Sequence, residues 1–326
     1  MLRRICSTGI LCLCFWGSLS AATVTVAADG SAQFKTVGEA LASGAEDIRI
    51  RPGTYKELLN ISRAGVHLRG LGARPDDVVL TYDLSAGTGG GTTKSASITV
   101  SGDDFYAENL TIENSFSRTR PLTQEGSQAV ALKVTGDRGV FRKVRFLGYQ
   151  DTLYANSKRC ESDKGPCEPA RQYFVDCYIE GNVDFIFGDA LAYFENCEIH
   201  ALAHPLVYLT AQSRHYAGER SGYVFDHCRV TADPEAKRIY LGRPWRAYGT
   251  VVFLNTALPA EITAEGWHEW EHDGKPSLLT AFYAEYRSSG PGANSSRRQL
   301  TAAEAARFER KVFLAGDDGW DPTKAH

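Results

Sequence analysis

The sequence predicts an all-β chain folded as a parallel β-helix with short capping helices. One six-residue pattern of alternating apolar and polar residues recurs, as alternation does in strands; its copies are Ala107–Ile112, Phe141–Phe146, Phe174–Ile179, Phe194–Ile199 and Phe225–Val230. No long amphipathic helix separates the copies, so strands that stack directly on their neighbours account for the spacing.

An antiparallel β-sandwich is the alternative architecture. It would place turn signals every ~8–12 residues, and the Gly and Pro residues of this chain are spaced less regularly. The repeats therefore favour the β-helix.

The N-terminal segments suit the same architecture. Short apolar runs broken by Gly and Pro predict strands at Val24–Val26, Asp47–Arg51, Val66–Leu68 and Val78–Leu80. Phe34–Leu41 has helical spacing and is expected to cap the N-terminal end of the solenoid. Thr301–Phe313, rich in Ala, Glu and Arg, is expected to be a helix on the outside.

Composition bounds the class of protein. The chain has 326 residues, 43% of them hydrophobic, and a net charge of −3, which argues against a nucleic-acid partner. Residues 1–22 combine Arg3 and Arg4, an apolar stretch and a small-residue cleavage site, as secretory signals do. An uncleaved anchor is the alternative, but the stretch is short for a membrane span. We expect a secreted monomer, extracellular or periplasmic, with one domain over residues 23–326 and no membrane partner.

Two aspartates occupy the same point of two repeats. Phe141–Tyr154 aligns with Phe174–Phe187 without a gap, which pairs Asp151 with Asp184. If the repeats stack, the two carboxylates are neighbours, so one pKa rises and the other falls. Such a pair can act as acid and nucleophile or hold a metal. The alternative is two turn aspartates that bind backbone amides.

Four other residues carry suitable chemistry. Gln128, which we expect to open a strand, and Gln150 offer amide donors for an oxyanion. Arg243 can fix a carboxylate, and Trp245 can stack on a sugar. As alternatives, the glutamines are solvated strand ends and Arg243–Trp245 is a surface turn with an ordinary salt bridge.

Five cysteines follow the signal segment. Cys177 and Cys197 share a repeat position one short coil apart, and stacked strands lie ~4.8 Å apart, so we expect a Cys177–Cys197 disulfide. Cys160 and Cys167 flank a loop that they could clip, which leaves Cys228 as a buried thiol. Cys-x₂-Cys spacing is absent, so we expect no zinc.

Several segments together resemble the signatures of pectin methylesterases: Gly53–Glu57, Gln128–Leu132, Gln150–Leu153, Gly181–Gly188 and Leu241–Trp245. The resemblance extends from about Val24 to about Trp270. It implies a right-handed parallel β-helix that removes methyl esters from pectin without a metal or cofactor. It also matches the Cys177/Cys197 pair to a disulfide of bacterial members.

The resemblance also implies roles. Asp184 would be the nucleophile, Asp151 the acid and then the base, and Gln128 and Gln150 the oxyanion donors. Arg243 would hold Asp184 ionised, and the residues expected to contact the sugar are Trp245, Tyr154, Phe187 and Thr93. Competing hypotheses are a pectate lyase or polygalacturonase on the same scaffold, a non-pectic acyl esterase or thioesterase, and a non-catalytic carbohydrate-binding β-helix.

Overall fold

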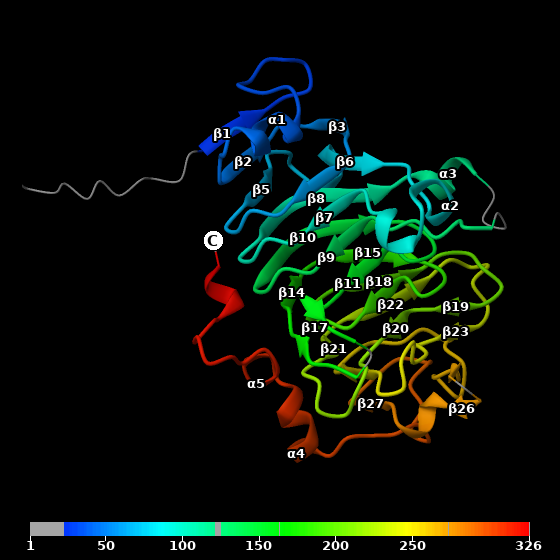
Figure 1. The fold of residues 1–326 in the computed structure, drawn as a ribbon. Helices are drawn as coiled ribbons and strands as arrows, with labels where there is room; N and C mark the ends of the chain where they lie inside the picture. Colours follow the sequence, from blue (N-terminus) through cyan, green and yellow to red (C-terminus); the bar gives the residue numbers. More distant parts are fainter. Residues whose placement is uncertain (1–22, 121–124, 163, 273, 326) are drawn as a thin grey trace, which may run out of the picture.

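The computed structural model describes residues 23–120, 125–162, 164–272 and 274–325, so the expected signal segment 1–22 lies outside the described residues. Two parallel sheets run along the molecule (Figure 1). The main path of the larger sheet is β1 (Thr23–Val26), β2 (Asp47–Ile50), β5 (His67–Gly70), β8 (Tyr106–Asn114), β10 (Gly139–Leu147), β14 (Arg171–Val175), β17 (Leu191–Glu195), β21 (Gly222–Asp226), β24 (Thr250–Leu254) and β27 (Phe282–Tyr286).

Other strands extend these layers. Beside the main path lie β3 (Gly53–Lys56), β6 (Val78–Tyr82), β15 (Tyr178–Gly181), β18 (Glu198–Ala201) and β22 (Arg229–Ala232). The second sheet contains β4 (Leu59–Ile61), β7 (Ile98–Val100), β9 (Leu132–Val134), β11 (Leu153–Ala155), β16 (Ile186–Gly188) and β20 (Thr210–Gln212). The successive coils in the middle of the molecule add one rung to each sheet, and the coils wind in the right-handed sense of parallel connections. The predicted parallel β-helix is confirmed.

Three strand pairs lie outside the stack. They are β12 (Arg159–Cys160) with β13 (Cys167–Glu168), β19 (Val207–Tyr208) with β23 (Ile239–Tyr240), and β25 (Glu271–His272) with β26 (Lys275–Pro276). The helices are α1 (Val37–Ala42), α2 (Ala86–Gly89), α3 (Phe116–Thr119), α4 (Ala302–Ala305) and α5 (Arg310–Phe313), with 3₁₀ turns η1 (Pro75–Asp77), η2 (Thr92–Lys94), η3 (Ser277–Leu279), η4 (Ala306–Phe308) and η5 (Pro322–Lys324). No helix among the described residues has the length and apolar character that a bilayer crossing needs.

The repeated pattern forms the core. Its first position is a column of stacked phenylalanines, in which Phe194 lies 4.7 Å from Phe174 and 4.5 Å from Phe225 between ring centroids. Its third position is a left-handed corner, with φ between 51° and 55° at Asn109, Lys143, Asp176, Asn196 and His227. The pattern is therefore not one flat strand. It bends at the third residue, where Asn and Asp tolerate positive φ best.

Helices cover the N-terminal end and one flank. Thr36 caps α1 by accepting a hydrogen bond from the Glu39 amide (3.1 Å), and α1 buries Val37 and Ala40. The C-terminal segment runs along the outside of the stack (Figure 1). The single helix expected over Thr301–Phe313 is instead split, because Glu309 is extended (φ −61°, ψ 140°) and separates α4 and η4 from α5.

The cysteines divide differently from the sequence prediction. Cys160 and Cys167 form a disulfide across β12 and β13, while Cys177, Cys197 and Cys228 are buried free thiols, so the predicted Cys177–Cys197 bridge is wrong. Side chains of stacked, in-register strands point the same way and stay ~4.8 Å apart, beyond the ~3.8 Å Cβ separation of a typical disulfide. The Cys177 and Cys197 thiols instead face the carbonyls of Phe141 and Phe174 on the preceding coil (3.4 and 3.5 Å).

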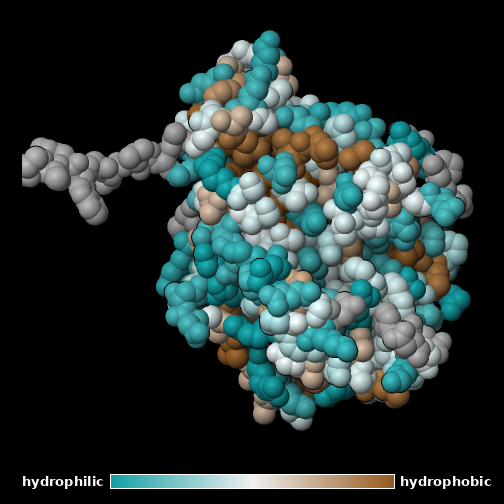
Figure 2. Space-filling model, viewed as in Figure 1, coloured by the Kyte–Doolittle hydropathy of each residue, from teal (hydrophilic) through white to brown (hydrophobic). Residues whose placement is uncertain are grey.

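One face of the molecule is mostly polar. Figure 2 shows that this face is largely hydrophilic or intermediate, with hydrophobic atoms in separate patches.

Candidate active site

A pocket of about 350 Å³ opens beside the second sheet. Residues from at least four successive coils and from two flanking loops line it: Thr92, Thr93, Gln128, Gln150, Asp151, Asp184, Phe187, Ala211, Arg243, Trp245 and Trp270. The stacking of coils therefore brings together residues that lie far apart in the sequence, from Thr92 to Trp270.

The two aspartates occupy equivalent corners of adjacent coils. Leu153 pairs with Ile186, which is the alignment seen in the sequence, and the Asp151 amide donates to the Val183 carbonyl (3.1 Å). Both aspartates have a left-handed backbone, with φ of 65° at Asp151 and 52° at Asp184. Asp accepts this conformation at lower cost than bulkier residues do, and the corner turns both carboxylates toward the pocket.

Arg243 is the cationic partner of Asp184. Its Nε and Nη2 donate to the two carboxylate oxygens at 2.8 and 2.6 Å. The guanidinium also lies between two aromatic rings, 4.0 Å from the ring centroid of Tyr208 and 4.3 Å from that of Trp270. A bidentate, stacked guanidinium fixes the plane of the carboxylate as well as its charge.

The two carboxyl groups differ in their electrostatic surroundings. Burial raises the pKa of Asp184, and the ion pair with Arg243 acts against that rise. Burial and the neighbouring Asp184 carboxylate raise the pKa of Asp151 well above its usual range. Within the described residues Asp151 forms no ion pair. As pH rises, Asp184 therefore ionises first, while Asp151 keeps its proton as an acid.

Gln128 and Gln150 lie next to each other in the wall of the pocket. The Ala129 amide donates to the Gln150 carbonyl (3.2 Å), and the Gln128 carbonyl accepts from the Ala86 amide (2.7 Å). Gln128 does not open a strand, because β9 begins only at Leu132. Its irregular backbone is held by the first residue of α2, and the side chains of Gln128 and Gln150 line the pocket.

The aromatic residues expected at the site divide between two cavities. Phe187 and Trp245 line the pocket, with their ring centroids 6.0 Å apart in an edge-to-face arrangement. Tyr154 stacks on Phe187 (4.4 Å, 5° between planes) and faces an adjoining cavity of about 510 Å³ instead. Thr93 lies in the pocket wall at η2.

Sequence reasoning missed Trp270, Tyr208, Thr92 and Ala211. Trp270 lines the pocket, and both Trp270 and Tyr208 stack on Arg243, but neither belongs to a repeat copy that singles it out in the sequence. Ala211 is placed by β20, which pairs with β16 and so sets Ala211 beside Phe187. The position of Ala211 could have been predicted by extending the repeat in Phe174–Phe187 to the next coil. That coil has a different length, so the alignment is not evident from the sequence.

Comparisons with known proteins agree on one family. A model of the pectinesterase family matches residues 23–317. Pectinesterase 31 of Arabidopsis thaliana is 37% identical over 313 residues, covering 89% of this chain and 92% of that protein. The putative pectinesterase/pectinesterase inhibitor 28 of the same plant is 34% identical over 92% of this chain, but the chain spans only 41% of its length.

Solved structures are similar over most of the chain. The pectin methylesterase from Erwinia chrysanthemi and a pectin methylesterase in complex with a hexasaccharide each have a TM-score of 0.79 and 32% identity, over 92% of this chain and 98% of theirs. The residues matched by the family model include every residue that lines the pocket. This chain belongs to the pectinesterase family.

Proposed function

We propose that this chain hydrolyses the methyl esters of pectin and releases methanol. The observation that carries the proposal is the pair of stacked aspartates in a pocket that both glutamines line. Arg243 holds one of them, and the other has no ion pair with any residue that the structure describes. Family membership and the hexasaccharide complex of a similar enzyme support a polysaccharide substrate.

The first half of the reaction uses Asp184 as nucleophile. Its carboxylate attacks the ester carbonyl, and the oxyanion of the tetrahedral intermediate accepts hydrogen bonds from the Gln128 and Gln150 amides. Collapse breaks the bond to the methoxy oxygen, which takes the proton of Asp151 and leaves as methanol. The galacturonyl group remains on Asp184 as an anhydride.

The second half returns the enzyme to its starting state. Asp151, now ionised, accepts a proton from water, and the resulting hydroxide attacks the anhydride carbonyl. Cleavage releases galacturonate and restores the Asp184 carboxylate beside Arg243. Trp245, Phe187 and Trp270 present ring surface on which the sugar can stack.

We also propose that the chain is exported and acts as a monomer, with residues 1–22 as its signal segment. The charged start and apolar stretch of that segment support export, and the acidic balance of the chain does not suit a nucleic-acid partner.

Methanol release from highly methylated pectin tests the function. With EDTA present, wild type should release methanol and Asp184→Asn should not, while the variant keeps the circular dichroism of the wild type. Equal release by both proteins would contradict Asp184 as nucleophile, and release by neither would contradict the pectinesterase assignment.

A further inference from the structure

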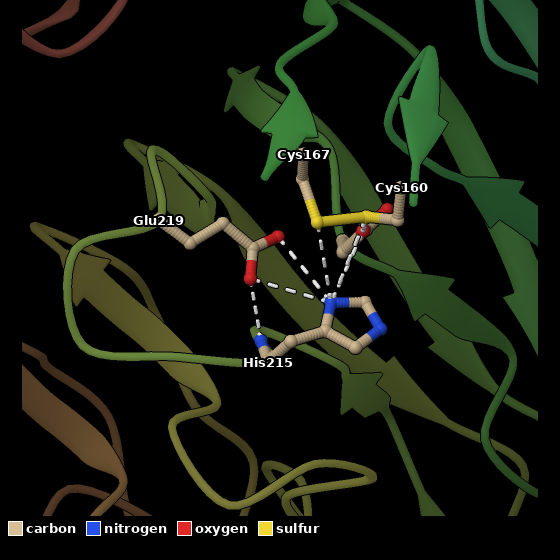
Figure 3. A group of neighbouring side chains, drawn as sticks. Cys160, Cys167, His215 and Glu219 are labelled. Carbon is tan, nitrogen blue, oxygen red and sulfur yellow. Dashed lines mark hydrogen bonds and ion pairs between the residues drawn. A yellow bond between two sulfur atoms is a disulfide. The ribbon is translucent and has the colours of Figure 1, made fainter. Parts of the chain in front are cut away.

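Five potential metal ligands converge outside the proposed active site. They are the sulfurs of Cys160 and Cys167, His215 Nδ1, and the carboxylates of Asp189 and Glu219, and their ligand atoms all lie within 4.8 Å of one another. Figure 3 shows the disulfide and the Glu219 carboxylate both facing the same nitrogen of the His215 imidazole. The residues come from the β12–β13 hairpin, the end of β16 and the loop between β20 and β21. Sequence reasoning therefore missed this group, because it looked for Cys-x₂-Cys spacing, which the chain lacks.

The nitrogen and oxygen ligands are spaced for one tetrahedral cation, whereas the two sulfurs are bonded to each other and separate only after reduction. Two nitrogen or oxygen ligands ~2.0–2.1 Å from zinc lie roughly 3.3–3.4 Å apart at a tetrahedral angle. His215 Nδ1 is 3.4 Å from Asp189 Oδ2, the separation expected for two ligands of one zinc ion. Both cysteine sulfurs lie 3.9 Å from the same nitrogen, a separation that the longer zinc–sulfur bond accommodates.

The cluster has an excess of buried negative charge. The Asp189 side chain is 1% exposed and that of Glu219 is 2% exposed. Within the described ranges, neither carboxylate forms an ion pair with a lysine or arginine. The nearby Arg214 guanidinium binds Thr250 Oγ1 (3.1 Å) and the Ala217 carbonyl instead.

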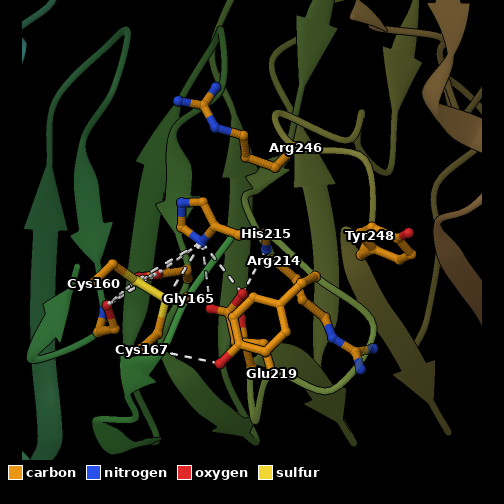
Figure 4. Close-up of polar contacts among 12 residues, drawn as sticks. Cys160, Gly165, Cys167, Arg214, His215, Glu219, Arg246 and Tyr248 are labelled. Carbon is orange, nitrogen blue, oxygen red and sulfur yellow. Dashed lines mark hydrogen bonds and ion pairs between the residues drawn. A yellow bond between two sulfur atoms is a disulfide. The ribbon is translucent and has the colours of Figure 1, made fainter. Parts of the chain in front are cut away.

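Fixed hydrogen bonds hold these groups in place. Ser157 donates from its amide (2.5 Å) and its hydroxyl (2.9 Å) to Asp189, and the His215 amide donates to Glu219 (2.5 Å). The hydroxyl of Tyr216 accepts from the Cys167 amide (3.2 Å), which ties the hairpin to the loop of His215. Figure 4 shows the hairpin, the imidazole and Glu219 as one contiguous group. Asp189 and His215, supported in this way, need little movement to bind a cation.

The oxidation state of Cys160 and Cys167 decides whether the site can hold a cation. Cys160 Sγ lies 3.1 Å from Asp189 Oδ2, and a disulfide sulfur has no proton to donate to that oxygen. After reduction the same sulfur becomes a thiol or thiolate facing a carboxylate. A thiolate there adds a negative charge that a divalent cation would neutralise.

We propose that reduction of the Cys160–Cys167 disulfide creates a zinc site, and that disulfide and zinc exclude each other. A dithiol donates two electrons and two protons to the disulfide and is oxidised to its own disulfide. Zn²⁺ then displaces the two thiol protons and binds both sulfurs, His215 Nδ1 and Asp189. Glu219 keeps its bond to the His215 amide and positions the loop. The adjoining cavity of about 510 Å³, lined in part by Cys160, Asp189 and His215, gives reductant and ion access.

Metal titration of the full chain tests this inference. The protein is reduced with a dithiol, freed of reductant under nitrogen and titrated with Co²⁺ as a spectroscopic probe, then with Zn²⁺. We expect one Co²⁺ per chain with thiolate-to-cobalt charge-transfer absorption, displaced by one Zn²⁺, and no such absorption from the oxidised protein. His215→Ala should weaken the affinity at least ~10-fold.

Two variants separate this site from other thiols. Cys160→Ser/Cys167→Ser should lose the absorption and keep wild-type circular dichroism, while Cys177→Ser, which removes a free thiol elsewhere, should retain it. The inference is overturned if reduced wild type binds no Co²⁺, if the double serine variant still shows thiolate absorption, or if the oxidised protein binds Zn²⁺ equally tightly.

Discussion

Replacing Arg243 by methionine separates its electrostatic role from its packing role. Methionine keeps apolar contact with Tyr208 and Trp270 but leaves the Asp184 carboxylate without its two hydrogen bonds of 2.8 and 2.6 Å. Removing one partner of a buried ion pair costs ~3–5 kcal/mol. Because the Arg243 side chain is 22% exposed, we expect the lower end, about 3 kcal/mol at neutral pH.

The same energy acts on the ionisation of Asp184. About 3 kcal/mol corresponds to roughly a 100-fold change in the ratio of ionised to protonated carboxyl. The variant should therefore lose activity, and the acidic limb of its kcat/KM profile should move to higher pH. Since this pKa rises further above its unfolded value, the loss of stability should be greatest at high pH and should shrink as acid protonates Asp184.

Urea unfolding at several pH values and a pH–rate profile measure both effects. Arg243→Met in an Asp184→Asn background is the matched control, because both charges are then absent and most of the stability cost should disappear. A loss of stability that is independent of pH, together with an unmoved acidic limb, would show that Arg243 acts through packing alone.

Four further outcomes are expected. Gln150→Ala should lower kcat by ~10²–10³-fold with little change in KM, and an unchanged kcat would exclude it as an oxyanion donor. Asp151→Asn should be inactive yet more stable than wild type at neutral pH. The pKa of Asp151 is higher in the folded state than in the unfolded state, so its contribution to stability is complete below the unfolded-state pKa and is lost as pH rises through the folded-state pKa. Urea unfolding should show that the gain in stability of the variant vanishes below about pH 4. Phe194→Ala should cost ~3–5 kcal/mol by opening the aromatic column, and a cost below ~1 kcal/mol would contradict the packing. Alkylation of the unfolded, unreduced protein should label Cys177 and Cys197, and mass mapping of a bridge between them would refute the assignment of free thiols.

The fold was predictable because the repeat copies lie in register in the structure. The equivalent positions of Asp151 and Asp184 in two repeats became a stacked pair because backbone hydrogen bonding fixes the pairing of parallel strands. The disulfide prediction failed for the same reason. Register shows that Cys177 and Cys197 are neighbours, but stacked side chains run parallel, and a bridge needs them to converge.

Residues outside the repeats were less predictable. Trp270 reaches Arg243 from a loop whose course is set by Glu269, which accepts hydrogen bonds from the Trp270 and Ser277 amides (3.0 and 2.6 Å). The split of the expected C-terminal helix at Glu309 depends on packing against β17 and β14, including the bond of Arg310 to Tyr173 (3.3 Å). The spacing of residues along the sequence predicts neither the course of the Trp270 loop nor the break in the C-terminal helix.

The unequal lengths of the coils have a consequence for how this protein can change. The coil from Arg145 to Tyr178 is much longer than the coil from Tyr178 to Glu198, yet each rises by a single rung. Extra residues, such as those between β11 and β14, leave the stack sideways as loops. Insertions and deletions in those loops can reshape the rim of the cleft while the distance between the Asp151 and Asp184 carboxylates stays that of neighbouring strands. Substrate preference and reaction chemistry can therefore diverge independently in this scaffold.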